Sequence, residues 1–196
     1  MRDVQAAGGA AIGAPHAPVA RRLIWTTALT IAAVGYALDQ VTKYLAITYL
    51  DPADPPVLLG GLLTLQLIFN PGAAFSMGEG FTVGLTVIAA AALVFVLAWL
   101  LPRTRHRGWS VALGLLLAGI LGNLTDRLVR PPGFAHGHVV DFLQLPYFAI
   151  FNVADMCITA AAVLIIWFVV IAQTGPDGVR FADAKPKPSQ HPAREP

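Results

Sequence analysis

Three aspartates are the residues of this 196-residue chain best suited to chemistry. Asp126, Asp141 and Asp155 stand at the ends of, or between, two long apolar stretches. Ionisable groups at such positions are costly in a membrane and usually mark a functional site. Two carboxylates held together in a partly dry site share a proton, and such a pair can activate water against a peptide bond. The sequence therefore predicts that two of these aspartates form a general acid–base pair.

The neighbours of the three aspartates favour Asp141 and Asp155 as the pair. Arg127 directly follows Asp126, and an ion pair with it would hold Asp126 as a permanent anion, which suits proton sharing poorly. Asp141 and Asp155 have mostly apolar neighbours. A second interpretation makes Asp155 a helix-start carboxylate favoured by the helix dipole, but Asn152 lies on the same helix face and favours a site role. Asp126 remains a competing candidate for one of the two positions in the pair.

Two further motifs have both a structural and a functional interpretation. Asp39 and Lys43 are four residues apart on one helix face, which predicts a structural ion pair with Lys43 reaching outward to the interface. Asp39 is also a candidate for orienting another site residue. The segment 70–76, Asn-Pro-Gly-Ala-Ala-Phe-Ser, fits a substrate cradle or an ordinary turn equally well.

Asn123 lies three residues before Asp126 and shares its helix face. Gly114, Gly119 and Gly122 in the same stretch predict tight helix packing. His136 and His138 form only a weak zinc pattern, because no further matching ligands accompany them, so no metal or other cofactor is expected. Cys157, the single cysteine, is interpreted as a packing residue.

The composition requires lipid as the solvent for most of the chain. Hydrophobic residues make up 56% and charged residues 12%, whereas soluble domains have about 25% charged residues. Four apolar stretches, at 23–50, 81–101, 109–128 and 151–172, are each close to the roughly 20 residues that a spanning helix needs. The fold class predicted is an all-α membrane protein with one four-helix domain, residues 21–174. Disordered tails are expected at 1–20 and 175–196.

The basic residues predict how the spans are oriented. If there are four spans, one side of the membrane receives Arg21, Arg22, Arg103, Arg105, Arg107, Arg180, Lys185, Lys187 and Arg194. That side, with both termini, should be cytoplasmic. Lys43, Arg127 and Arg130 are the exceptions. The polar motifs then fall near the extracytoplasmic face, where the partly alternating segment 62–69 predicts a small β-like cradle between spans one and two.

Five motifs together resemble the prolipoprotein signal peptidases, the signal peptidase II family of bacterial intramembrane aspartyl peptidases. They are Asp-Gln-Val-Thr-Lys at 39–43, the segment 70–76, Gly-x-x-Gly-Asn-x-x-Asp-Arg at 119–127, Val-Val-Asp-Phe at 139–142 and Phe-Asn-Val-Ala-Asp at 151–155. The motifs follow the family's order along residues 23–172. Only thirteen residues separate Asp141 from Asp155, and Met156-Cys157 stands where small polar residues are expected; these are departures from the family pattern.

The resemblance implies an endopeptidase of the bacterial cell membrane. Its substrates would be diacylglyceryl-modified prolipoproteins, cut just before the lipidated cysteine, with membrane lipid but no nucleic acid as a partner. The family pattern places the catalytic pair on Asp141 and Asp155. The supporting or substrate-binding positions are Asp39, Lys43, Asn70, Gly72, Asn123, Asp126, Arg127, Asn152 and Ala154.

Two rival interpretations come from other classes of membrane protein. A small transporter would use intramembrane carboxylates as a proton relay, but the chain has no inverted repeat and its carboxylates gather near one face. A structural four-helix subunit leaves the polar motifs without a role.

Overall fold

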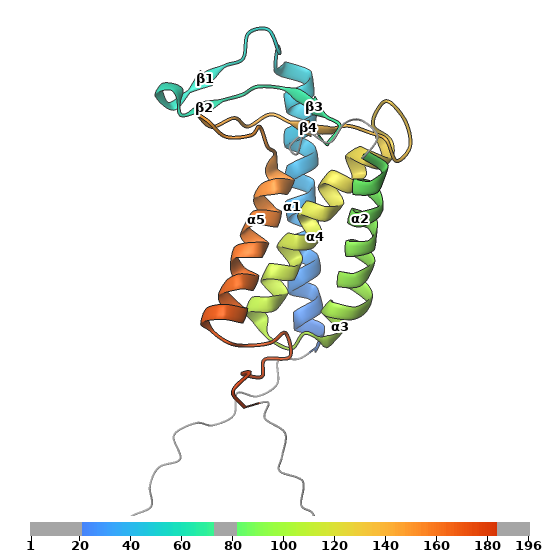
Figure 1. Ribbon diagram of the computed structural model, residues 1–196, viewed down its shortest axis with the longest axis vertical. Helices are drawn as coiled ribbons and strands as arrows, with labels where there is room; N and C mark the ends of the chain where they lie inside the picture. Colours follow the sequence, from blue (N-terminus) through green and yellow to red (C-terminus); the bar gives the residue numbers. More distant parts are fainter. Residues whose placement is uncertain (1–20, 73–81, 184–196) are drawn as a thin grey trace, which may run out of the picture.

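Four long helical segments stand side by side in the computed structural model, which describes residues 21–72 and 82–183 (Figure 1). They are α1 (Arg21–Tyr49), α2 (Thr82–Phe95), α4 (Arg107–Val129) and α5 (Val153–Ile166). Helix α2 continues through the π-helical segment η4 (Val96–Leu100) into α3 (Leu101–Arg103), and α5 continues into the π-helical segment η5 (Trp167–Ile171). The four segments agree with the predicted apolar stretches to within two residues at each end.

Three of these helical segments are long and apolar enough to cross a membrane: Thr82–Arg103, Arg107–Val129 and Val153–Ile171. Helix α1 is not among them, and its apolar sequence is interrupted by Asp39 and Lys43. The structure therefore confirms the mostly helical membrane fold with three candidate spans, and the fourth span stays a prediction.

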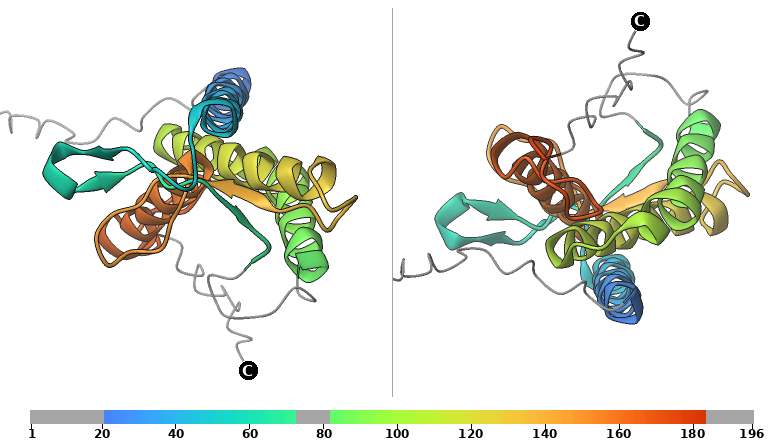
Figure 2. Two further views of the ribbon diagram at one scale, coloured as in Figure 1. Left: turned by 90° about the horizontal axis from the view of Figure 1, so that it is seen from above. Right: turned by 90° about the horizontal axis from the view of Figure 1, so that it is seen from below.

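Helix α4 is the centre of the bundle. Viewed from above, it lies between α1 on one side and α2 and α5 on the other, and it packs against all three (Figure 2). Buried residues make up 67% of its span, compared with 11% for the α2 span and 17% for the α5 span. Glycines allow this close packing, as predicted: Gly114 faces the backbone of α1, and Gly119 faces the backbone of α5.

Replacing Gly119 by alanine is expected to destabilise the bundle. An added Cβ would overlap the carbonyl oxygen of Ala154 and the side chain of Ile158. Relieving this overlap would require the backbone of α5 to move away from α4. Overpacking of this kind costs about 1–3 kcal/mol. Thermal unfolding in detergent should therefore show a lower Tm for Gly119→Ala. Gly133→Ala is the matched control, because nothing lies within 4 Å of its added Cβ, and equal melting of the two variants would contradict this packing.

Short strands cover one end of the bundle. Strands β1 (Val57–Leu58) and β2 (Leu63–Thr64) form an antiparallel hairpin around the short helix η1 (Leu59–Gly61). The hairpin projects sideways beyond the helices (Figures 1 and 2), and Leu59 and Leu62 at its tip are exposed. The predicted strand segment 62–69 contains β2 and the start of β3 (Ile68–Asn70). Residues 73–76 of the predicted cradle motif lie outside the described residues.

A second two-stranded sheet joins distant parts of the chain. Strand β3 pairs antiparallel with β4 (Val139–Asp141), with Ile68 opposite Asp141 and Asn70 opposite Val139. Because side chains alternate along a strand, Asn70 and Asp141 lie on the same face of this sheet. The pairing thus brings a residue before α2 into the neighbourhood of a residue after α4.

The segment that follows α5 folds back on the opposite end of the bundle. Residues 175–183, within the predicted C-terminal tail, form a turn that is closed by a bridge between Thr174 and Arg180. The carbonyl oxygen of Pro176 accepts hydrogen bonds from the N–H groups of Arg105 (2.7 Å) and His106 (3.2 Å). The other parts of the two predicted tails, 1–20 and 184–196, lie outside the described residues.

Candidate active site

Asp141 ends strand β4 inside a shell of asparagine donors. Asn70 Nδ2 donates to Asp141 Oδ2 at 2.8 Å, and Asn152 Nδ2 donates to Asp141 Oδ1 at 2.6 Å. Only 2% of Asp141 is exposed. Burial raises the pKa of the Asp141 carboxyl to about 6, and the nearby charge of Asp155 adds to the rise, while the two asparagine hydrogen bonds oppose it. This carboxyl therefore keeps its proton to a higher pH than an ordinary aspartate does.

Asp155 lies at the start of α5 and belongs to its N-terminal cap. Asn152 is the N-cap residue: its side chain accepts from the Asp155 N–H at 3.0 Å, and its own N–H donates to Asp155 Oδ2 at 3.1 Å. This is the reciprocal capping box. Asn123 Nδ2 donates to the other carboxylate oxygen at 2.8 Å. The structural interpretation of Asp155 as a helix-start carboxylate is therefore right, and it coexists with the contacts of a site residue.

Two asparagines connect the two carboxylates. Asn152 contacts both Asp141 and Asp155, and its Nδ2 also donates to Asn123 Oδ1 at 3.2 Å. Asn123 in turn contacts Asp155. The two aspartates differ in surroundings, since Asp141 is buried and Asp155 is half-buried. The two carboxyls, which differ in burial, are therefore held in one hydrogen-bonded frame formed by Asn123 and Asn152.

Lys43 is the centre of a buried ionic cluster behind this frame. Its Nζ lies 2.9 Å from Asp39 Oδ2 and 2.7 Å from Asp126 Oδ2, and it donates to Asn123 Oδ1 at 3.1 Å. The side chains of all three charged residues are fully buried. The predicted Asp39–Lys43 ion pair is confirmed. The expectation that Lys43 reaches outward is wrong, because two carboxylates hold its ammonium group inside the bundle.

The partner predicted for Asp126 is also wrong. Arg130, four residues on, pairs with Asp126 Oδ1, whereas Arg127 donates to the carbonyl oxygen of Asn123 at 3.3 Å. The i,i+4 spacing of Asp126 and Arg130 was the signal in the sequence that could have identified this pair. Asp126 Oδ2 also accepts from the Val140 N–H at 3.3 Å, so Asp126 ties α4 to β4.

Ala154 and Gly72 contribute through their backbones. The Ala154 N–H donates to Asp39 Oδ1 at 2.8 Å, which fixes the start of α5 to α1. The Gly72 N–H donates to Asn70 Oδ1 at 2.8 Å. Gly72 has a φ of 119°, a conformation that side-chain-bearing residues avoid. Its turn holds the Asn70 amide so that its NH₂ group faces Asp141.

All eleven predicted site residues thus lie at the strand-covered end of the bundle. Ten of them take part in this connected set of contacts. The eleventh, Arg127, contacts only the backbone carbonyl of Asn123 among them. Gln40, which was not among the site predictions, also belongs to the set, because its Nε2 donates to Asp39 Oδ2 at 3.0 Å. Within residues 21–72 and 82–183, no group of three or more His, Cys, Asp or Glu side chains is arranged to hold a metal ion.

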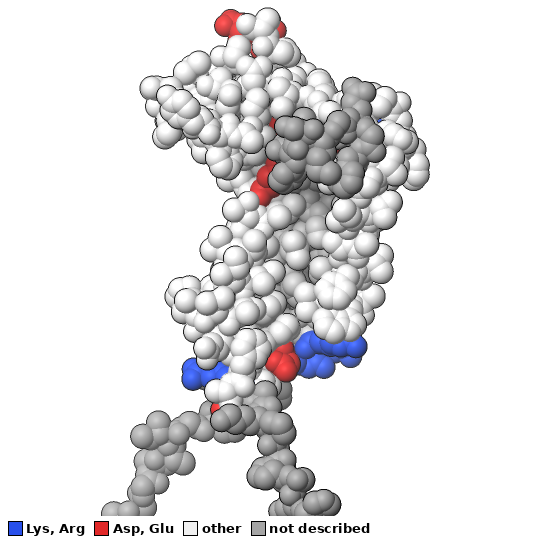
Figure 3. Space-filling view, viewed as in Figure 1, with Lys and Arg blue, Asp and Glu red and all other residues white. Residues whose placement is uncertain are grey.

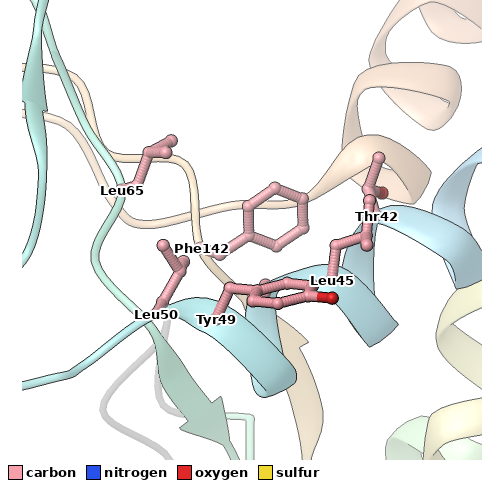
Figure 4. A pocket seen from close by; sticks show the side chains of 7 residues that line it. Thr42, Leu45, Tyr49, Leu50, Leu65 and Phe142 are labelled. Carbon is pink, nitrogen blue, oxygen red and sulfur yellow. The ribbon is translucent and has the colours of Figure 1, made fainter.

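An apolar pocket lies beside the frame, at the end of α1 (Figure 4). Its volume is about 320 Å³, and it is lined by Thr42, Leu45, Ala46, Tyr49, Leu50, Leu65 and Phe142. Phe142 follows Asp141 directly, and consecutive side chains of an extended chain point to opposite sides. The pocket therefore lies across the strand from the Asp141 carboxyl, and it contains no carboxylate.

Comparison with known protein families identifies the family to which this chain belongs. The family model described as signal peptidase (SPase) II matches residues 31–171, which include all eleven predicted site residues. This chain belongs to the signal peptidase II family. It is therefore related to bacterial membrane proteases, and its apolar helices agree with a multi-pass protein of the bacterial membrane.

Individual members of the signal peptidase II family cover most of the chain. The lipoprotein signal peptidase of Leifsonia xyli subsp. xyli is 45% identical over 154 residues, which are 78% of this chain and 70% of that protein. The lipoprotein signal peptidase of Rhodococcus jostii is 43% identical over 170 residues, 85% of this chain and 83% of that protein. The one from Mycobacterium tuberculosis H37Rv is 40% identical over 166 residues, 85% and 80% of the two chains.

A solved structure supports the same fold for this family member. A bacterial membrane enzyme determined by the in meso method at 1.9 Å resolution superposes with a TM-score of 0.61 and 31% sequence identity. The match covers 74% of this chain and 94% of the solved chain. The helical bundle described above is therefore an architecture already observed in a bacterial membrane enzyme.

Proposed function

We propose that this chain is an intramembrane aspartyl endopeptidase that removes signal peptides from diacylglyceryl-modified prolipoproteins. It cuts just before the lipidated cysteine, and Asp141 and Asp155 activate the attacking water. Membership of the signal peptidase II family supports the substrate class. The observation that carries the chemistry is the frame in which Asn152 contacts both carboxylates while Asn123 holds Asp155.

The unlike surroundings of the two carboxyls assign their roles. Asp155 is half-buried, belongs to the N-terminal cap of α5 and accepts two hydrogen bonds from N–H groups; it has the role of the base. It takes a proton from water while the water oxygen attacks the scissile carbonyl carbon. Asp141 gives its proton to the carbonyl oxygen. As the tetrahedral intermediate collapses, the amine leaves with a proton from Asp155, and one hydroxyl of the intermediate returns a proton to Asp141. The remaining product is a carboxylic acid, and both aspartates regain their starting protonation states.

The remaining site residues hold this pair in place. Asn70 and Gly72 position one face of Asp141, and Asn123 and Asn152 set the spacing of the carboxyls. The buried cluster of Asp39, Lys43 and Asp126 fixes α1, α4, β4 and, through Ala154, the start of α5. Arg127 lies at the edge of the frame and donates to the carbonyl oxygen of Asn123. The step uses protein carboxylates and water, with no metal or organic cofactor.

The proposed topology has four spans in one domain, residues 21–174, with α1 as the fourth membrane-crossing helix. The exposed basic residues Arg21, Arg22, Arg103, Arg105 and Arg107 support it, because they lie at the end of the bundle opposite the strands. In Figure 3 the arginines gather at the lower end of the visible face. That end and both terminal tails are then cytoplasmic. The active site lies near the extracytoplasmic face, and the β1–β2 hairpin forms a cradle on the membrane surface.

The proposed function is tested by cleavage in detergent, where no ion gradient exists. The purified chain is incubated with a precursor peptide whose cysteine carries diacylglycerol, and with the same peptide bearing an unmodified cysteine. We expect a product that begins with the lipidated cysteine and little or no product from the unmodified peptide. A folded protein that cuts neither peptide would contradict the proposal and favour a transporter.

The pH dependence of cleavage should report the proton on Asp141. With a pKa of about 6, the protonated acid is lost as the pH rises, so kcat/KM should fall about tenfold per pH unit well above pH 6. The Asn70 hydrogen bond favours the Asp141 anion, so Asn70→Ala should raise this pKa and move the alkaline limb to higher pH. Asp54→Asn, an exposed carboxylate change, is the control and should leave the limb in place. A limb that moves to lower pH in Asn70→Ala would contradict the assigned acid.

A further inference from the structure

An apolar groove lies on the outer face of the helix formed by α2 and η4. Alanines and larger apolar side chains line it together; the lining residues are Val87, Ala90, Ala91, Val94, Phe95, Ala98 and Trp99. The hollow measures about 660 Å³. From Val87 to Trp99 the helix rises about 18 Å, which is comparable with the length of a lipid acyl chain in one leaflet. None of the lining side chains is charged.

An arginine lies beside one end of this groove, over the ring of Trp99. The Arg103 guanidinium carbon lies 4.7 Å from the centroid of the Trp99 ring, and Arg103 Nη1 donates to the Trp99 carbonyl oxygen at 2.8 Å. Trp99 in turn stacks on Phe95, with ring centroids 5.0 Å apart. The arginine is therefore held over the aromatic end of the groove. Its guanidinium carries five N–H donors, and the hydrogen bond to Trp99 uses one of them.

The surroundings of Arg103 suit an anion. Arg103 is exposed and takes part in none of the ion pairs found among residues 21–72 and 82–183. Arg105 and Arg107 follow in the same short connection between helices and are exposed as well. Guanidinium groups bind phosphate oxygens through paired N–H donors, and juxtamembrane arginines attract acidic lipid headgroups.

We propose that this groove binds one acidic phospholipid, whose phosphate contacts Arg103 and whose acyl chain lies along α2 from Trp99 towards Val87. The acyl chain of such a lipid matches the apolar lining of the groove, and its anionic headgroup matches Arg103 at one end. The tryptophan marks the interfacial level at which the headgroup meets the hydrocarbon. The site is separate from the Asp141–Asp155 pair, and the inference does not depend on the peptidase chemistry.

The test is native mass spectrometry of delipidated protein titrated in detergent with phosphatidylglycerol or with phosphatidylcholine of the same acyl chains. We expect the first phosphatidylglycerol to bind about fivefold more tightly than phosphatidylcholine, because one arginine attracts the net negative charge of phosphatidylglycerol, whereas choline neutralises the phosphate charge of phosphatidylcholine. Arg103→Gln should remove that preference, because it weakens phosphatidylglycerol binding more than phosphatidylcholine binding. Ala91→Trp, which fills the groove, should weaken both lipids.

Arg22→Gln is the matched control, because Arg22 is an exposed arginine at the same end of the bundle on α1. It should keep the wild-type preference. Equal binding of the two lipids by wild type would overturn the site. So would an equal loss in Arg22→Gln and Arg103→Gln, which would show a general surface-charge effect. A mass of two protein chains that Ala91→Trp dissociates would also overturn it, since the groove would then be a contact between copies.

Discussion

Replacing Asp141 or Asp155 by asparagine should lower kcat/KM for precursor cleavage by about 10⁴-fold, the upper range for the loss of a general acid or base. A carboxamide at position 155 cannot take a proton from water, and a carboxamide at position 141 cannot give one to the carbonyl oxygen. The two residues act as a unit, so the double variant should be little worse than either single variant. Cleavage rates under single-turnover conditions measure the effect.

The same variants should remain folded. In Asp141→Asn the side chain keeps one acceptor and turns an NH₂ group towards either Asn70 or Asn152, which costs about 1 kcal/mol. Removing a buried carboxylate offsets that cost at neutral pH, because burial has raised its pKa. Thermal unfolding within a few degrees of wild type is the control. Activity within tenfold of wild type in either folded variant would show that the chemistry lies elsewhere.

Replacing Lys43 by methionine should destabilise the protein by about 3–5 kcal/mol, because it leaves buried carboxylates without their shared cation. Asp39 and Asp126 are both fully buried, and Asp39 has no other cationic partner among the described residues. Methionine keeps most of the volume of lysine, so the effect is electrostatic. Equilibrium unfolding in detergent would measure the loss of stability.

Two companion variants test whether the loss comes from the ion cluster. Adding Asp39→Asn to Lys43→Met should recover part of the stability, because it removes the carboxylate that lost its only described cation. Arg22→Met removes an exposed cation that joins no ion pair among residues 21–72 and 82–183, and should change the stability by less than about 0.5 kcal/mol. If Lys43→Met unfolds like Arg22→Met, the cluster does not stabilise the bundle.

The helices could be predicted from the sequence because an apolar stretch of about 20 residues has few alternatives to a helix in lipid. The pairing of β3 with β4 could not be predicted from the sequence. Ile68–Asn70 and Val139–Asp141 are separated by about 70 residues, and strands of three residues carry too little pattern to identify a partner. The contact between Asn70 and Asp141 depends on that pairing, so its geometry required the structure.

The ion-pair partners of Asp126 show a second limit of prediction from the sequence. Asp39 and Lys43 belong to one helix, and their spacing alone predicted their contact. Asp126 receives its cations from Lys43 on α1 and Arg130 at the end of its own helix, and the adjacent Arg127 is directed elsewhere. Neighbouring residues on a helix point about 100° apart, so adjacency was the weaker signal and the i,i+4 spacing the stronger one.

The most direct test of the Asp141–Asp155 pair compares wild type, Asp155→Asn and Asp126→Asn on one diacylglyceryl-cysteine precursor. Products are mapped by mass spectrometry, and rates are divided by the folded fraction. Asp126→Asn is the informative comparison, because Asp126 is the third aspartate of the region and belongs to the ionic cluster. We expect wild type and the folded part of Asp126→Asn to cut just before the lipidated cysteine, and folded Asp155→Asn to give no product. Cleavage by Asp155→Asn with none by folded Asp126→Asn would contradict the assignment of the catalytic pair.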